Sequence, residues 1–322
     1  MNSYHDKPYI ELLVDILKNG RKCVDRTGTG TIKVFSRQMR FDLSDGTIPL
    51  LTTKKMHIPA ILHEIIWYLS GNSNIKYLQD NGVRIWNEWA DENGDLGPVY
   101  GYQWRHWEQF EPAQMGNGGM MLYRKKGEVD QIADVINRLK TKPDDRRIIV
   151  SAWNVGQLED MNLPPCHYTF QFFSTEMTRE ERVRWFTFYY GSNDLLDHTE
   201  EYIDQALGNH NVPTRSLSCM LNQRSCDTFL GVPFNIVQYS ILTRMICEVV
   251  DMAPGEFIWN GGDTHIYLNH VEQVMTQIGR DPYPSPTLKF ARPVDNIDDF
   301  GYDDFVIDYQ QFHPTIKAKV SV

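Results

Sequence analysis

The sequence feature that most constrains the fold is a long apolar run from Asn235 to Val250. A helix that carries apolar side chains around its whole circumference lies in the interior of a protein or a membrane. A membrane span requires about 18 consecutive apolar residues, and the chain contains no such run. The run therefore predicts a helix buried in a protein core.

Weaker patterns predict a mixture of helices and strands around this helix. Periodic apolar positions and capping residues predict further helices at 8–19, 59–69, 129–139 and 263–277. Alternating or short apolar runs predict strands at 31–41, 168–173, 217–222, 287–290 and 305–307, and one more after Arg146-Arg147. We interpret residues 1–322 as a single α+β domain.

The segment 174–216 differs in composition from its surroundings. It is rich in charged residues and interrupts two runs that resemble neighbouring strands, 168–173 and 217–222. We expect a surface insertion between two adjacent strands, with a helix near 200–206. Loops of this length are uncommon and are usually functional or peripheral.

Composition and charge limit the classes of partner. The chain has 322 residues, 41% of them hydrophobic, and a net charge of −10, which describes a globular protein without the basic field that draws duplex DNA. The N-terminus lacks the charged-then-apolar pattern of a signal peptide. The five cysteines are scattered, with no C-x-x-C pair, so we expect a cytoplasmic location and no zinc site.

The strongest chemical signal is a cysteine in a proline-fixed bend, Pro164-Pro165-Cys166-His167. A single cysteine is most often a buried structural residue, but two preceding prolines and a following imidazole favour a reactive one. Only the thiolate attacks, and a nearby cation such as Arg224 favours that form. Sequence spacing alone does not establish that Arg224 lies near the thiol.

Other polar residues have both a structural and a functional interpretation. Glu64 lies beside the apolar face of the 59–69 helix, where burial would raise its pKa and suit it to proton transfer. Arg146-Arg147 are surface arginines or a phosphate clamp. His265 and Tyr267 bracket one residue and would point the same way on a strand.

Six motifs, in order along the chain, resemble the thymidylate synthase family: Asp95–Gly101, Arg146–Asn154, Pro165–His167, Gln223–Asp227, Leu230–Asn235 and Gly262–Tyr267. With the Asp25–Gly30 loop, the resemblance covers nearly the whole chain. It implies a three-layer α/β (α+β) fold around a large mixed β-sheet. It also implies reductive methylation of 2′-deoxyuridine 5′-monophosphate (dUMP) to thymidylate, with 5,10-methylenetetrahydrofolate as carbon donor and reductant, dihydrofolate as second product, and no metal.

The resemblance implies roles for individual residues. Cys166 would attack C6 of uracil, Arg224 would stabilise the thiolate and contact phosphate, and Asn235 would recognise the uracil amide edge. The other catalytic residues would be Glu64, Tyr100, His167 and Asp227. The full dUMP site would comprise Arg26, Arg146, Arg147, Arg224, Ser225, Asp227, Asn235, His265 and Tyr267.

The folate site and the assembly are also implied by the resemblance. The folate site would comprise Lys54, His57, Trp86, Trp89, Asp227, Leu230, Gly231, Phe234 and Val322. Lys54 and His57 would lie towards the glutamate tail of the folate, and the C-terminal Val322 would close over the site. The family is a homodimer, in which Arg146 and Arg147 would be donated to the partner's phosphate site.

Two alternatives stay open. A deoxyuridylate hydroxymethylase of the same superfamily shares the early steps and then adds water to the exocyclic methylene in place of hydride. Asn235 argues against the deoxycytidylate version, which carries an aspartate there. A non-enzymatic protein that binds RNA or a partner is the second alternative; the Cys166, Arg224 and Asn235 set argues against it, and the chain lacks an aromatic and basic single-strand signature.

Overall fold

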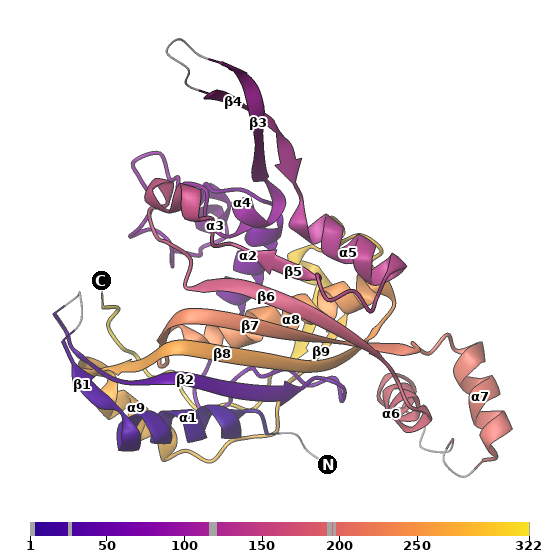
Figure 1. Cartoon of the computed structure of the whole chain (residues 1–322). Helices are drawn as coiled ribbons and strands as arrows, with labels where there is room; N and C mark the ends of the chain where they lie inside the picture. Colours follow the sequence, from indigo (N-terminus) through magenta and orange to yellow (C-terminus); the bar gives the residue numbers. More distant parts are fainter. Residues whose placement is uncertain (1–3, 25–27, 116–120, 192–194, 196–197, 322) are drawn as a thin grey trace.

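A six-stranded mixed sheet forms the centre of the molecule in the computed structural model, which describes residues 4–24, 28–115, 121–191, 195 and 198–321 (Figure 1). The strand order is β1-β2-β8-β7-β6-β5. Only the β7–β8 pair is parallel; the other neighbours run antiparallel. This confirms the predicted α/β fold around a large mixed sheet. The strands are β1 Arg21–Cys23, β2 Thr31–Asp42, β5 Ile149–Ser151, β6 His167–Glu176, β7 Arg215–Asp227 and β8 Ala253–Tyr267.

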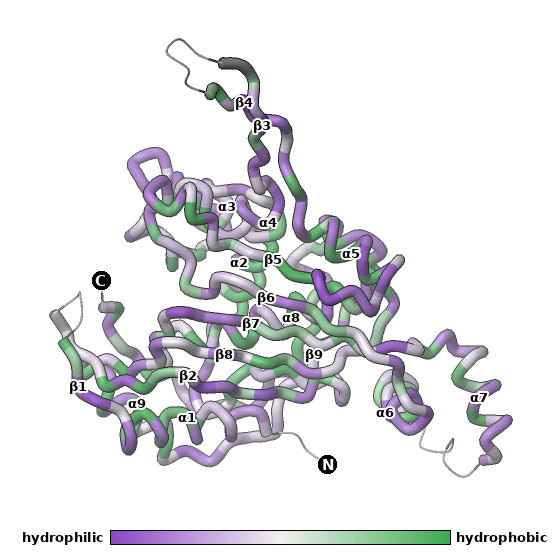
Figure 2. The backbone as a smooth tube through the Cα atoms, in the orientation of Figure 1, coloured by the Kyte–Doolittle hydropathy of each residue, from purple (hydrophilic) through white to green (hydrophobic). Residues whose placement is uncertain are grey.

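The predicted buried helix is present as α8, Val232–Val250, and it connects the parallel strands β7 and β8. Parallel strands need a crossover of this kind, because a tight turn reverses the chain direction and would make the pair antiparallel. Pro233 lies in the first turn, where its missing N–H removes no helical hydrogen bond. Figure 2 shows hydrophobic segments in the centre of the molecule, around α8 and β5.

Three other helices agree with the sequence patterns: α1 Asp6–Asn19, α2 Ile58–Leu69 and α5 Gln131–Thr141. The two tail strands, β9 Thr287–Phe290 and β10 Phe305–Asp308, pair antiparallel as a separate ribbon. The body also contains three short helices, α3 Lys76–Asp80, α4 Gly101–Arg105 and α9 Val271–Ile278. It has 3-10 turns at Val155–Asp160, Leu268–His270, Ile297–Asp299 and Tyr302–Asp304.

The prediction of a helix over 263–277 is wrong in its first half. Residues 263–267 are the end of strand β8, and only Val271–Ile278 is α-helical. Strand β8 pairs with β2 as far as Tyr267 and with β7 as far as His265. Pairing on both sides holds residues 263–265 in an extended conformation. Tertiary pairing overrides a local pattern that is ambiguous over a few residues.

A hairpin that the sequence patterns did not indicate projects from the body (Figure 1). Its strands are β3 Trp107–Met115 and β4 Met121–Val129, paired antiparallel with two irregularities. Most described side chains of β4 are exposed, so the alternation of buried and exposed residues that marks a half-buried strand is missing.

The insertion between β6 and β7 forms a two-helix arm, and these two strands are antiparallel neighbours as expected. Its helices are α6 Arg179–Tyr190, which contacts the body through Phe188 and Tyr189, and α7 Glu200–Asn209, which lies farther from the sheet (Figure 1). The Thr178 hydroxyl accepts from the Glu181 amide and the Glu181 carboxylate accepts from the Thr178 amide, a capping box that starts α6. The helix expected near 200–206 is therefore confirmed.

Among the helices of the described ranges, none is both long enough and apolar enough to cross a bilayer.

Candidate functional site

Cys166 lies in a bend at the start of β6 and is held by contacts with two other elements. Its backbone N–H donates to the Tyr100 hydroxyl at 2.9 Å, and its carbonyl accepts from the Arg224 amide at 2.8 Å. The Arg224 guanidinium donates from Nε to the Pro165 carbonyl at 2.9 Å and from Nη2 to the Pro164 carbonyl at 2.8 Å. The structure thus brings Arg224 to the cysteine loop, which sequence spacing alone left open.

The rest of the Arg224 guanidinium faces an open cavity. Its central carbon lies 5.3 Å from the centre of the Trp153 ring, a cation–π contact. Arg224, Trp153, Tyr168 and Phe35 line a cavity of about 430 Å³ beside strands β2, β6, β7 and β8. A guanidinium that braces a loop on one side and faces a cavity on the other can bind an anion there.

Tyr100 and His167 form a stacked pair beside the cysteine, with ring centres 4.2 Å apart. Burial raises the pKa of Tyr100 well above its usual range, so the hydroxyl keeps its proton. Tyr100 has a φ of 32°, an uncommon backbone conformation for a residue other than glycine, just before α4. Burial lowers the pKa of His167 to about 3, and its Nδ1 lies 2.8 Å from the Tyr239 hydroxyl. The imidazole is therefore neutral at physiological pH.

Glu64 lies on α2 with its carboxylate inside the protein, only 6% exposed. It accepts hydrogen bonds from the Tyr68 hydroxyl at 3.1 Å, the Trp86 indole N–H and the Gln238 amide. Burial raises its pKa, and the three donors oppose that rise. A raised pKa suits a carboxyl to proton transfer.

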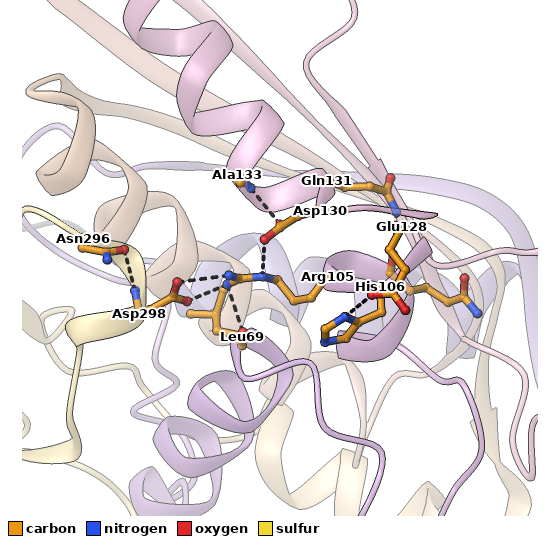
Figure 3. A network of polar contacts seen from close by, with 10 residues as sticks. Leu69, Arg105, His106, Glu128, Asp130, Gln131, Ala133, Asn296 and Asp298 are labelled. Carbon is orange, nitrogen blue, oxygen red and sulfur yellow. Dashed lines mark hydrogen bonds and ion pairs between the residues drawn. The ribbon is translucent and has the colours of Figure 1, made fainter. Parts of the chain in front are cut away.

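A network around Arg105 holds the helices that carry these groups (Figure 3). Arg105, in the last turn of α4, donates to the Leu69 carbonyl at the end of α2 at 3.0 Å. Its fork binds Asp298 at 2.6 and 3.0 Å, and its Nε binds Asp130, the N-cap of α5, at 3.0 Å. The network fixes α4, which follows Tyr100, against α2, which carries Glu64.

Asp227 ends strand β7 and shapes the loop that follows. Its Oδ1 accepts from the Phe229 and Leu230 amides, both at 3.1 Å. The chain then passes through Gly231 into the first turn of α8, which carries Phe234 and Asn235. Leu230, Gly231, Phe234 and Asn235 are all partly exposed, so this corner is open to a ligand.

His265 and Tyr267 are two residues apart on β8, so both project from one face of the strand. Their rings meet edge to face at 5.2 Å. Asp227 is the register partner of His265 in the neighbouring strand, and Ser225 is the partner of Asp263. The sheet thus assembles four of the predicted site residues, Ser225, Asp227, His265 and Tyr267, at one end of two parallel strands.

Of the described residues expected to bind folate, Lys54 is the most enclosed. Its Nζ donates to the Phe229 carbonyl at 2.5 Å and lies 3.9 Å from the centre of the Phe229 ring. Burial lowers the pKa of Lys54 to about 7. His57 is exposed and caps α2, where its Nδ1 accepts from the Ala60 amide at 3.2 Å.

Trp86 and Trp89, both expected to bind folate, meet edge to face with ring centres 5.9 Å apart. The Trp86 indole N–H bonds to Glu64, and Trp89 is partly exposed beside it. They link the Glu64 carboxyl to an aromatic wall suited to a flat ring.

Arg146 and Arg147 are not brought to Cys166 of the same chain. Both are exposed, and Arg147 precedes the Ile149 that pairs with Gln171. Extending that register places Arg147 about seven residues along β6 from Cys166, or roughly 20 Å at about 3.3 Å per residue. These arginines therefore lie far from the cysteine that their own chain supplies.

The loop before these arginines is well anchored. Asp145 accepts from the Arg147 side chain and amide and from Arg138, and these contacts hold the pKa of Asp145 at about 2. The neighbouring Asp144 binds Arg215, the first residue of β7.

Two predicted site residues, Arg26 and Val322, lie outside the described residues.

Sequence reasoning missed the hydrogen-bond partners of Glu64 and His167. Tyr68 and Gln238 bind Glu64, and Tyr239 binds His167. Gln238 and Tyr239 are polar positions inside the apolar run 235–250, and that interruption is the one signal that could have identified them.

Within the described part of the chain, no group of three or more His, Cys, Asp or Glu side chains is arranged to hold a metal ion. A comparison with models of protein families finds that the thymidylate synthase model matches residues 7–322.

Proposed function

The chain belongs to the thymidylate synthase family, and we propose that it converts dUMP to thymidylate with 5,10-methylenetetrahydrofolate, which becomes dihydrofolate. The family supports a transferase of nucleotide biosynthesis that uses a folate cosubstrate. Choosing this reaction over that of a related hydroxymethylase is our proposal.

The observation that carries the proposal is the contact between Arg224 and the cysteine loop. The Arg224 amide bonds to the Cys166 carbonyl, and its guanidinium bonds to the two preceding carbonyls. A fixed guanidinium next to the loop supplies the positive charge that favours a thiolate. The same group faces the cavity in which a phosphate would bind.

The reaction begins with attack of the Cys166 sulfur on C6 of uracil, which leaves C5 as an enolate nucleophile. C5 takes the one-carbon unit that the folate supplies, and loss of the C5 proton then allows tetrahydrofolate to leave. Hydride from that tetrahydrofolate reduces the exocyclic methylene to methyl, and the sulfur departs as thiolate. Covalent attachment thus divides one difficult substitution into easier steps.

The proton transfers fall to Glu64 and its neighbours. The Glu64 carboxyl is buried with a raised pKa, so it can give a proton to O4 when the enolate forms and take one back later. The Tyr100 hydroxyl keeps its proton, and His167 is neutral, so both serve as hydrogen-bonding groups that add no charge.

Recognition of the nucleotide is assigned to the open corner around Asp227 and the two parallel strands. The Asn235 amide pairs with N3–H and O4 of uracil, which discriminates against cytosine because cytosine would leave those groups unpaired. His265 and Tyr267 hold the deoxyribose hydroxyl, and Arg26, Arg224 and Ser225 hold the phosphate. Folate stacks beside Trp86, Trp89, Leu230, Gly231 and Phe234, with Lys54 and His57 towards its tail and Val322 closing over it.

The arginine pair supports a homodimer. Arg146 and Arg147 lie roughly 20 Å from their own cysteine along the sheet, and the family is typically dimeric. In a two-fold dimer each chain offers the same patch to its partner. We assign Arg146 and Arg147 to the partner's phosphate site.

One incubation tests the proposal: purified protein, dUMP and methylenetetrahydrofolate, with products identified by mass spectrometry. Thymidylate with dihydrofolate is the expected result. Hydroxymethyl-deoxyuridylate with tetrahydrofolate would instead identify the hydroxymethylase. Cys166→Ser is expected to lower turnover by about 10⁴-fold or more while dUMP still binds. Full activity in that variant would contradict the nucleophile assignment.

A further inference from the structure

His270 is a buried titratable residue that the reaction described above does not use. It ends the 3-10 turn Leu268–His270 between β8 and α9. Its side chain is fully buried, while the two preceding residues, Leu268 and Asn269, are exposed. A polar ring so completely enclosed requires partners for its nitrogens.

The two ring nitrogens of His270 face two different parts of the molecule. Nε2 lies 2.7 Å from the Lys319 carbonyl in the C-terminal segment. Because a carbonyl only accepts, Nε2 must carry the proton and donate it. Nδ1 lies 4.0 Å from Oδ1 of Asp227, too far for a hydrogen bond, and it has no hydrogen-bond partner among the described residues.

The His270 ring is fixed by its aromatic neighbours. It packs against Phe229 at 5.5 Å and against Tyr267 at 5.6 Å, measured between ring centres. These neighbours belong to the loop after Asp227 and to the end of β8, the two segments that form the open corner of the site. The ring therefore cannot turn away from Lys319 without disturbing that corner.

The C-terminal segment is attached to the body at several earlier points. The His313 amide donates to the Thr52 carbonyl at 2.7 Å, and Arg280 donates to the Pro314 carbonyl at 2.8 Å. Two residues after Lys319, the Ser321 hydroxyl accepts a contact of 3.5 Å from the Asn269 side-chain amide. His270 thus supplies a short, buried anchor close to the chain end.

We propose that His270 is a positioning residue that sets the C-terminal segment in register against Asp227 and thereby controls binding of the folate cosubstrate. The proposal rests on the proposed function, because it concerns the folate side of that site. His270 touches no reacting atom; it acts through the Lys319 carbonyl and the Asp227 loop.

Two amide variants separate the two sides of the ring. The Gln side chain is one carbon longer than that of Asn, so His270→Gln carries its N–H₂ to the place of Nε2 and keeps a donor for Lys319. His270→Asn carries its amide to the place of Nδ1 and leaves the Lys319 carbonyl unpaired. Both variants remove the imidazole and both retain a polar group, so each is the control for the other.

The expected result is a selective defect in His270→Asn. Its KM for methylenetetrahydrofolate should rise about tenfold, since losing one buried hydrogen bond has an effect of that order. Its KM for dUMP should stay within about twofold of the parent. His270→Gln should stay within about threefold of the parent for both ligands. A carboxypeptidase should also remove the chain end faster from His270→Asn than from His270→Gln.

Equal loss of dUMP and folate affinity in both variants, with an equal fall in melting temperature, would overturn the proposal and leave His270 as a core residue. Parent-like folate kinetics in His270→Asn would overturn it as well. If the parent protein binds neither dUMP nor folate, the proposed function fails, and the carboxypeptidase comparison still tests the contact with Lys319 separately.

Discussion

The main body and the insertion arm are built differently from the same chain. The body encloses one continuous core around α8 and the six-stranded sheet, whereas the described part of the arm has a separate cluster of six buried apolar residues: Val183, Phe186, Leu195, Ile203, Leu207 and Val212. Among the described residues, none of the buried polar or charged side chains lies between 177 and 214. The ion pair of Arg179 with Asp204 at 2.8 Å is exposed, and the arm is joined to the body where the Tyr189 hydroxyl accepts from the buried Arg244 at 3.2 Å.

This difference indicates which part of the molecule can carry catalytic side chains. Burial is what moves the pKa of Glu64 up and that of His167 down, and only a large core provides it. The arm is too small to enclose a charged group, and its surface ion pairs contribute little to stability. We therefore expect the arm to be separable from catalysis, and the following tests examine that separation.

The largest difference between the regions should appear when one carboxyl is neutralised in each. Glu64→Gln keeps the shape of the side chain and removes its proton transfer, so kcat should fall by about 10²- to 10⁴-fold. Asp204→Asn in the arm should leave kcat within about twofold. Steady-state assays of thymidylate formation measure both. A comparable loss in the two variants would mean that the arm takes part in turnover.

The same core truncation in each region should give an intermediate effect. Leu221 in β7 and Leu207 in α7 are both fully buried. Leu→Ala at such sites destabilises by about 2–5 kcal/mol. Leu221→Ala should lower the melting temperature of the whole protein, whereas Leu207→Ala should open only the arm.

Hydrogen exchange resolved by peptide distinguishes these outcomes. Leu207→Ala should increase exchange in α6 and α7 and leave the activity and the exchange of β6–β8 as in the parent. Faster exchange throughout the sheet in Leu207→Ala would show that the two cores are one cooperative unit.

The smallest effect concerns pH. The native pKa of His167 is about 3, against 6.5 for an ordinary histidine, so the unfolded chain binds the proton first as pH falls. Stability is then complete above pH 6.5 and declines down to about pH 3. The loss at pH 5 should be about 2 kcal/mol. His167→Asn, which places an amide near Nδ1, should remove that dependence.

Chemical unfolding at pH 7 and pH 5 measures the difference between His167→Asn and the parent. An identical pH dependence in the two proteins would mean that His167 is not the group that titrates. Deletion of 177–214 with a short turn in its place should leave the His167 effect unchanged, because that residue belongs to the body.

The sequence predicted those elements whose local pattern and tertiary role agree. The apolar run of α8 and the alternation of β2 are examples, since each element buries the face that its pattern marks. The end of β8 was mispredicted because its form depends on pairing with β2 and β7, which residue order does not reveal. The β3–β4 hairpin has few buried side chains and therefore no apolar signature.

The same distinction separates the site residues that the sequence predicted from those that it did not. Cys166, Arg224 and Asn235 could be named from motifs, because their chemistry is tied to short local patterns. The partners of Glu64 and His167 could not, because Gln238 and Tyr239 reach them from a helix far along the chain. The contact of Lys319 with His270 is likewise a property of the folded chain and not of either segment.

The arm also changes how the central sheet can form. Strands β6 and β7 are antiparallel neighbours, yet the chain between Glu176 and Arg215 is roughly ten times longer than a four-residue hairpin turn. Closing an unstructured loop of that length adds about 2 kcal/mol of chain entropy compared with a tight turn. Helices α6 and α7 bring the two ends together when they pack. An arm that folds early therefore acts as a preassembled turn. The pairing of β6, which begins next to Cys166, with β7 then depends on when the arm folds during synthesis.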